Sequence, residues 1–160
     1  MITFHYVKWK NFLSAGNQWT EISLDTHKNT LMMGHNGSGK STFLDALTFA
    51  LFGKPFRKVS KGNVVNSINN KNCMVEIGFT SNSKKYKVIR GAKPNVFEIY
   101  LDNTMINQDA SVKDYQEHLE KYILKMNYKS FTQIVILGSA RSEEHTSELQ
   151  SRLHLVCRLL

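Results

Sequence analysis

Gly34-His-Asn-Gly-Ser-Gly-Lys-Ser41 is the most informative segment of this chain. It matches the phosphate-binding loop pattern G-x-x-x-x-G-K-[ST] at every fixed position. Glycine lets the backbone turn tightly and approach a phosphate without a Cβ in the way, and successive N–H groups can then point into one concavity. The segment therefore predicts a site for the phosphates of a nucleotide, formed by Gly34, His35, Asn36, Gly37, Ser38, Gly39, Lys40 and Ser41.

Lys40 and Ser41 supply the chemistry that such a loop needs. The Lys40 ammonium group can pair with the β- and γ-phosphates, which makes it the candidate catalytic residue, and the Ser41 hydroxyl can bind Mg²⁺. Mg²⁺ usually keeps several waters and takes few protein ligands, so one hydroxyl is a sufficient contribution from the loop. We therefore predict ATP and Mg²⁺ as cofactors. A glycine-rich turn that binds nothing is the alternative.

The residues on either side of the loop predict a strand before it and a helix after it. Residues 29–33 are mostly apolar and end at the loop, as a buried strand should. Residues 41–52 place apolar side chains around almost the whole helical circumference, and Gly53 follows as a stop signal. The helix should therefore be buried between layers, with the positive end of its dipole facing the phosphates.

Most of the remaining chain predicts antiparallel strands joined by short turns. Residues 81–83 are typical of turns, and linkers this short join antiparallel neighbours. Further on, apolar residues recur at helical spacing, with Ser111 and Asp114 placed as a capping box. The expected strands are residues 1–10, 19–24, 73–80, 84–90, 96–101 and 104–106, the expected helix is 111–126, residues 64–72 should be a polar loop, and residues 130–138 should form a strand or a short buried helix.

The composition allows a single domain with a hydrophobic core. The chain has 160 residues, 41% of them hydrophobic, and a formal net charge of +8, which allows nucleic acid or other anions as partners. No apolar run approaches the roughly 20 residues of a membrane span, and the first residues do not resemble a signal peptide. The two cysteines lack metal-ligand spacing, so we expect a reduced, cytoplasmic setting. Because no apolar run is long enough to span a membrane, we expect no membrane partner.

Two groups of basic residues are candidate contacts to a DNA backbone. One group lies in the loop after the predicted helix, and the other lies on one face of a predicted strand. A solvated surface loop is the alternative for the first group. The candidates are Lys54, Arg57, Lys58 and Lys61 in the loop and Lys85 and Lys87 in the strand.

Residues 141–160 differ in character from the rest of the chain. Residues 141–151 resemble the translation of a common sequencing-library adapter, and residues 152–160 show no capping or turn pattern that joins them to the preceding chain. We therefore predict a native lobe over residues 1–140 and a non-native tail over residues 141–160. A real amphipathic C-terminal helix is the alternative. If the tail is foreign, the natural protein is expected to continue past Ala140.

Three segments together resemble one family of ATPases. Val7-Lys-Trp-Lys-Asn-Phe12, the phosphate loop and Ser41-Thr-Phe-Leu-Asp-Ala-Leu47 resemble the amino-terminal lobe of the SbcC-type DNA-repair ATPases. This group includes the large subunit of phage recombination endonucleases and is related to the SMC and RecF/RecN proteins. The resemblance covers residues 1 to about 140. The phosphate loop by itself identifies only a superfamily. The Lys-Asn-Phe segment and the β-rich insertion narrow the choice to this family.

The resemblance implies an α/β fold of the P-loop NTPase class, namely the amino-terminal half of an ABC-type ATPase head with an antiparallel β meander. It also implies a carboxy-terminal lobe beyond a long coiled coil, and a second head that dimerises with the first around ATP. The implied partners are double-stranded DNA and an SbcD-type metallo-nuclease subunit, in the host cytoplasm for a phage-encoded member. A RecF- or SMC-like clamp or loader without a nuclease, a transporter subunit and a non-enzymatic fragment remain alternatives.

Residue by residue, the resemblance places Thr42 near the α-phosphate and Asn11 beside the nucleotide. The family's arginine after the Asn-Phe pair is replaced by Leu13. Gln133 is the candidate for a glutamine that senses Mg²⁺ and the attacking water, although the family's glutamine usually stands where this chain has Leu137. The family's metal aspartate, catalytic glutamate and signature loop are not found. We therefore expect this chain alone to bind nucleotide weakly without useful hydrolysis.

Overall fold

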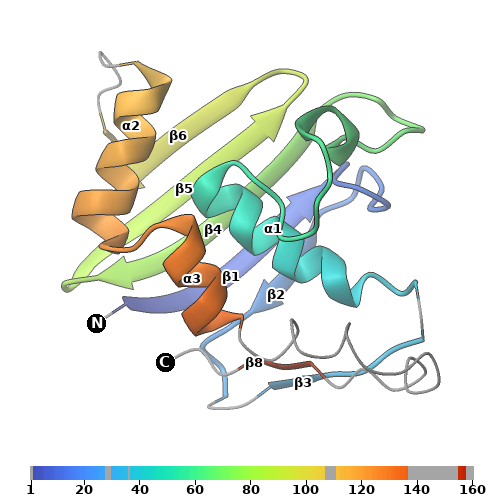
Figure 1. The fold of residues 1–160 in the computed structure, drawn as a ribbon, viewed down its shortest axis with the longest axis horizontal. Coiled ribbons are helices and arrows are strands. Elements are labelled where there is room, and N and C mark those ends of the chain that lie inside the picture. Colours follow the sequence, from blue (N-terminus) through green and yellow to red (C-terminus); the bar gives the residue numbers. More distant parts are fainter. Residues whose placement is uncertain (1, 28–29, 36, 107–110, 137–154, 158–160) are drawn as a thin grey trace.

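The computed structural model describes residues 2–27, 30–35, 37–106, 111–136 and 155–157 (Figure 1). These residues form a six-stranded antiparallel sheet with helices on one side, together with a separate two-stranded sheet. The large sheet has the strand order β2-β1-β4-β5-β6-β7. Its strands are β1 (Ile2–Lys10), β2 (Thr20–Ser23), β4 (Cys73–Ser81), β5 (Lys84–Ala92), β6 (Val96–Leu101) and β7 (Thr104–Met105), which confirms the predicted meander.

The helices lie together on one side of this sheet (Figure 1). The sequence predicted either a strand or a short buried helix for residues 130–138. In the structure they are helical as far as Val135. Within the described residues, no helix has the length and apolar character that crossing a membrane requires. The helices are α1 (Lys40–Phe52), the 3-10 turn η1 (Lys61–Val64), α2 (Val112–His118), its π-helical continuation η2 (Leu119–Leu124) and α3 (Tyr128–Val135).

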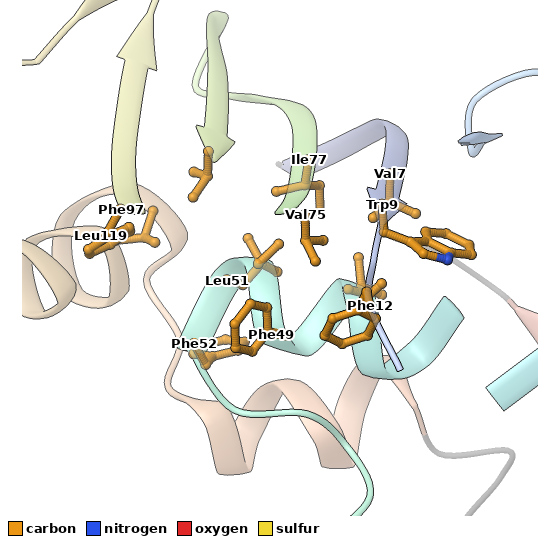
Figure 2. Packing of buried hydrophobic residues seen from close by; sticks show 14 of the residues in the cluster. Val7, Trp9, Phe12, Phe49, Leu51, Phe52, Val75, Ile77, Phe97 and Leu119 are labelled. Atoms are coloured by element: carbon orange, nitrogen blue, oxygen red, sulfur yellow. The ribbon is translucent and has the colours of Figure 1, made fainter. Parts of the chain in front are cut away.

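Helix α1 is the centre of the hydrophobic core. Every residue from Thr42 to Phe52 is buried, as the apolar circumference predicts. Gly53 ends the helix in the left-handed conformation, and its N–H donates to the Phe49 carbonyl at 2.8 Å. The core side chains of α1 meet those of the sheet and of the segment after β1 (Figure 2). Those labelled include Phe49, Leu51 and Phe52 of α1, Val75 and Ile77 of β4, Val7 and Trp9 of β1, and Phe12.

A β-bulge in β1 changes which residues enter the core. Strict alternation predicts that Phe4 and Tyr6 share one face of this strand. In the structure the register between β1 and β4 shifts between these two residues, with His5 as the extra residue. Val7 therefore follows Phe4 into the core, and Tyr6 lies on the opposite face.

The predicted helix over residues 111–126 is formed by α2 and η2. Ser111 caps α2 as expected, because its hydroxyl accepts the Asp114 N–H at 3.3 Å. The π-helical turn then changes the side-chain spacing. As a result Leu124 is buried, whereas Tyr122, which the periodic pattern places in the core, is 69% exposed.

Strand β3 (Thr30–Met32) leads into the phosphate loop but does not join the large sheet. It pairs antiparallel with β8 (Leu155–Cys157). The predicted strand is thus present, although Met33 at its end is 73% exposed rather than buried. Because β8 belongs to residues 141–160, part of the supposed tail has a place in the structure, and its non-native origin stays a prediction.

Candidate nucleotide-binding site

The phosphate loop joins β3 to the first turn of α1 and depends on glycine at three positions. Gly37 and Gly39 have φ angles of 84° and 90°, in the left-handed region that favours glycine. At Gly34 a Cβ atom would lie 2.5 Å from Ser38 Oγ, so a larger residue there would displace the Ser38 side chain. The Ser38 N–H donates to the His35 carbonyl at 3.1 Å and closes the turn. The backbone conformation therefore favours glycine at positions 37 and 39.

The start of α1 is arranged to receive an anion. Gly39 is its N-cap, so no side chain caps the first N–H groups, and the first turn has no acidic residue. Such N–H groups and the positive end of the helix dipole favour a phosphate. Ser41 is exposed, whereas Thr42 is only 5% exposed, so the Ser41 hydroxyl is the more accessible of the two. Asn36, another predicted site residue, lies outside the described residues.

The Lys40 side chain lies back across the loop. Its ammonium group donates to the His35 carbonyl at 2.8 Å and also to the Gly34 carbonyl. Phosphate oxygens would replace these neutral acceptors by charged ones, and hydrogen bonds between charged groups are stronger. The pairing of Lys40 with the β- and γ-phosphates stays a prediction.

The Ser41 hydroxyl is the candidate ligand for Mg²⁺ in this site. Among the described residues, no group of three or more His, Cys, Asp or Glu side chains could hold a metal ion. Mg²⁺ in phosphate-binding sites is usually held by one or two protein groups plus the substrate phosphates. The exposed Ser41 hydroxyl beside the uncapped start of α1 fits this kind of site.

Asn11 is a buried structural residue in this fold. It is 1% exposed, and its Nδ2 donates to Asn17 Oδ1 at 2.9 Å and to the Asn72 carbonyl at 3.2 Å. Its Oδ1 accepts from Asn69 Nδ2 at 2.7 Å, and its carbonyl accepts the Asn66 N–H at 2.8 Å. The supposed polar loop after η1 thus folds around Asn11. The predicted contact between Asn11 and the nucleotide gains no support from this arrangement.

Gln133 is exposed on α3. In the same helix, the rings of Tyr128 and Phe131 pack on Phe52, with centroids 5.7 Å and 5.2 Å away. Phe52 is the last residue of α1, and the phosphate loop lies at the opposite end of that helix (Figure 1). This packing does not by itself bring Gln133 to the phosphates, so its role as a sensor stays a prediction.

The basic loop after α1 is anchored to the helix through Arg57. The side chain of Asp45 is 0% exposed, and its carboxylate accepts the Arg57 N–H at 2.8 Å, Nε at 2.7 Å and Nη2 at 2.6 Å. Arg57 therefore neutralises a buried charge, and its predicted contact with DNA stays a prediction. Lys54 and Lys58 on either side are exposed, and the side chain of Lys61 lies outside the described residues. A carboxylate within an otherwise apolar helix was the sequence signal for this pair.

Lys85 and Lys87 lie on the face of the sheet that points away from α1, as alternation predicts. Lys85 is exposed, and Lys87 is half-buried with its Nζ 4.2 Å from the centroid of the Tyr100 ring. The two groups of basic candidates therefore belong to different surfaces. The loop group is joined to the phosphate-loop helix, and the strand group is separated from it by the sheet.

A phosphate loop between a short strand and a buried helix, packed on an antiparallel sheet, defines a P-loop ATPase domain. The chain matches the family described as "AAA domain" over residues 6–156 and belongs to it. It is similar to "Exonuclease subunit 2" of Enterobacteria phage T4, with 51% identity over 134 residues that cover 84% of this chain and 24% of that protein. The chain thus spans about a quarter of the length of that relative.

Two further comparisons agree with this assignment. The SbcC component of the SbcCD nuclease of Deinococcus radiodurans is 29% identical over 78% of this chain and 14% of that protein. A solved structure described as "Structural biochemistry of ATP-driven dimerization and DNA stimulated activation of SMC ATPases" has a TM-score of 0.60 at 18% identity, over 92% of this chain and 93% of that one. The resemblance to SbcC-type ATPases and their phage members is confirmed, as is the fold of an ABC-type head with an antiparallel meander.

Proposed function

We propose that this chain is the ATP-binding, amino-terminal lobe of the ATPase subunit of an exonuclease complex that processes DNA double-strand breaks. The observation that carries the proposal is the phosphate loop, with Lys40 lying across it, in a chain that is 51% identical to a phage exonuclease subunit. The names of the relatives favour a complex with a separate SbcD-type nuclease subunit over a clamp or loader without one. We expect this complex in the cytoplasm, which for a phage protein is that of the host.

In the proposed site, the N–H groups of the loop and of α1 bind the phosphates. Lys40 offsets the charge on the β- and γ-phosphates, and the Ser41 hydroxyl contributes to binding Mg²⁺. Mg²⁺ bound with ATP would stabilise the charge that moves during phosphoryl transfer, a reaction in which proteins act mainly by positioning and electrostatics. ATP would bind the closed pair of heads better than the open pair, and this difference in affinity would couple hydrolysis to opening.

Nucleotide binding tests the proposal directly. We expect the purified chain to bind a fluorescent ATP analogue in the presence of Mg²⁺, and Lys40→Ala to weaken that binding by about tenfold or more. Lys71→Ala is the matched control, because Lys71 is an exposed lysine outside the phosphate loop. Equal binding by the Lys40→Ala variant and the unchanged chain would sink the proposed site.

The proposed contact with double-stranded DNA is to its backbone. Lys54 and Lys58 are exposed on the loop that Arg57 fixes to α1. Backbone contacts release counterions, so affinity for duplex DNA should fall steeply as salt rises. An affinity that hardly changes between low and high salt would contradict this part of the proposal.

A further inference from the structure

One face of the six-stranded sheet has no helix over it within the part of the chain that the structure describes (Figure 1). Apart from the buried glycines Gly78 and Gly91, residues that point to this face are exposed or half-buried, whereas their neighbours that point to α1 are mostly buried. The uncovered face combines aromatic rings and lysines from three strands and one adjoining turn. Its aromatic and charged members are Tyr6, Lys8, Lys10, Trp19, Glu21, Glu76, Lys85, Lys87, Glu98 and Tyr100.

A row of paired residues crosses four strands of this face. Tyr6 is opposite Gly78, Gly78 is opposite Lys87, and Lys87 is opposite Tyr100. Since neighbouring strands are about 4.8 Å apart, the two tyrosines stand about 14 Å from each other. The Tyr6 ring lies over Gly78, where a Cβ atom would overlap three of its ring atoms. The glycine therefore lets this ring lie flat on the sheet, with its other side outward.

The rings on this face are accompanied by ammonium groups. Trp19 is 44% exposed, and the Nζ atoms of Lys8 and Lys10 lie 5.2 Å and 5.0 Å from its ring. The Nζ of Lys87 lies 4.2 Å from the Tyr100 ring. Cation–π pairs at exposed sites are weak. A nucleobase can therefore take the place of the ammonium group on the ring, and the ammonium group can move to a neighbouring phosphate.

The acidic residues of this face are held by its own side chains. Glu76 accepts from the Tyr6 hydroxyl at 2.7 Å and pairs with Lys8 at 3.2 Å, and Glu98 accepts from the Tyr100 hydroxyl at 2.9 Å. Glu21 stands opposite Lys8 in the register of β1 and β2. The four lysines and three glutamates named above leave a net charge of 4 − 3 = +1 on the face. The net charge of this face alone therefore does not indicate a ligand. The alternation of aromatic rings with lysine ammonium groups does indicate one.

We propose that this uncovered face binds single-stranded DNA, with bases stacked on Trp19, Tyr6 and Tyr100 and phosphates contacted by Lys10 and Lys87. Stacking on aromatic side chains beside basic groups is how proteins bind single strands without reading their sequence. The inference rests on the proposed function, because an exonuclease that degrades one strand of a duplex leaves the other strand unpaired. Duplex DNA keeps its bases paired and stacked, so it cannot use the rings.

Tryptophan fluorescence offers a direct test, because Trp19 is exposed and Trp9 is only 4% exposed. Oligo(dT) of about 16 nucleotides should quench Trp19, and should bind at least tenfold more tightly than a duplex of equal length. Tyr100→Ala should weaken oligo(dT) binding by about tenfold. Tyr122→Ala is the matched control and should leave the affinity unchanged, because Tyr122 is 69% exposed on η2, on the helical side of the sheet.

Two results with oligo(dT) and a third with duplex would each overturn the inference. One is equal affinity for oligo(dT) and duplex, and the other is unchanged oligo(dT) affinity in a Tyr100→Ala variant whose circular dichroism matches that of the original chain. Duplex binding without quenching by oligo(dT) would also overturn it, while the proposed function would stand. Nucleotide titration separates the two proposals: a chain that binds oligo(dT) and no ATP analogue would contradict the proposed function instead.

Discussion

At the residue scale, the buried carboxylate of Asp45 depends on Arg57. The Arg57 guanidinium supplies two of the hydrogen bonds that this carboxylate accepts. Arg57→Ala would leave a charge in the core without a counter-ion, and breaking a buried pair costs about 3 to 5 kcal/mol. Since the Arg57 side chain is 48% exposed and water can reach the pair, we expect a loss of about 2 to 3 kcal/mol. Urea unfolding followed by circular dichroism measures it.

The control for this prediction lies in the same loop. Lys58 is exposed, and Lys58→Ala should change the free energy of unfolding by no more than about 0.5 kcal/mol. Adding Asp45→Asn to Arg57→Ala should recover part of the stability, because a neutral amide costs less to bury than a lone carboxylate. If Arg57→Ala unfolds at the same urea concentration as the original chain, the pair does not anchor the loop.

The buried Cys73 thiol should make the folded chain less stable at alkaline pH. Burial raises the pKa of the Cys73 thiol from 9.0 to about 11. Between these values the folded chain keeps a proton that the unfolded chain releases, so stability is fully present below pH 9 and is lost as the pH rises toward 11. The loss should reach up to about 2 kcal/mol. The pKa of Tyr6 is also raised, by burial and then by Glu76, and acts in the same direction.

Unfolding in urea at a series of pH values checks this. Cys73→Ala should give a shallower fall of stability above pH 9 than the unchanged chain, even though its absolute stability differs. Cys157 is present in both chains and cancels in the comparison. Identical slopes in the two chains would show that the Cys73 thiol is not the group responsible.

At the element scale, the end of α1 depends on Gly53. This residue has a φ of 69°, and a Cβ atom there would lie 3.0 Å from Arg90 Nη1. Arg90 is buried and ties α1 to α2, because it donates to the Ala50 carbonyl at 3.1 Å and to Gln116 Oε1 at 2.6 Å. Gly53→Ala should therefore cost about 1 to 3 kcal/mol of stability through backbone strain and crowding.

Gly16 provides the comparison for Gly53. A Cβ atom at Gly16 would meet no atom within 4 Å, and its φ is not in the left-handed region. Gly16→Ala should stay within about 0.5 kcal/mol of the original chain in a thermal or urea unfolding experiment. Equal effects of the two substitutions on stability would mean that the end of α1 tolerates a side chain and does not require Gly53.

Elements with a local cause were predictable from the sequence. The apolar circumference of α1, its glycine stop and the glycines of the phosphate loop each follow from neighbouring residues. Features caused by distant contacts were not. The bulge at His5 follows from pairing with β4 and moves Tyr6 to the outer face. Apart from the one to Asn17, the bonds that occupy Asn11 come from asparagines far along the chain, so no local pattern could separate a structural role from a nucleotide contact.

At the scale of the whole molecule, the phosphate loop lies at the edge of the described structure rather than inside it. Strand β3 is outside the large sheet, and Met33 next to the loop is 73% exposed. An exposed apolar side chain beside a ligand site suits a surface that a second lobe covers. If the proposed function holds, we expect the carboxy-terminal lobe that it implies to supply the rest of the site.

This inference predicts binding without turnover. The purified chain should bind an ATP analogue and release phosphate at no more than the buffer rate, because positioned water and a metal-binding carboxylate are needed for phosphoryl transfer. Adding the carboxy-terminal part of phage T4 exonuclease subunit 2, a relative with 51% identity over the matched region, should raise phosphate release. The same mixture made with Lys40→Ala should stay at the buffer rate. Hydrolysis by this chain alone that depends on Lys40 would show that the site is complete without a second lobe.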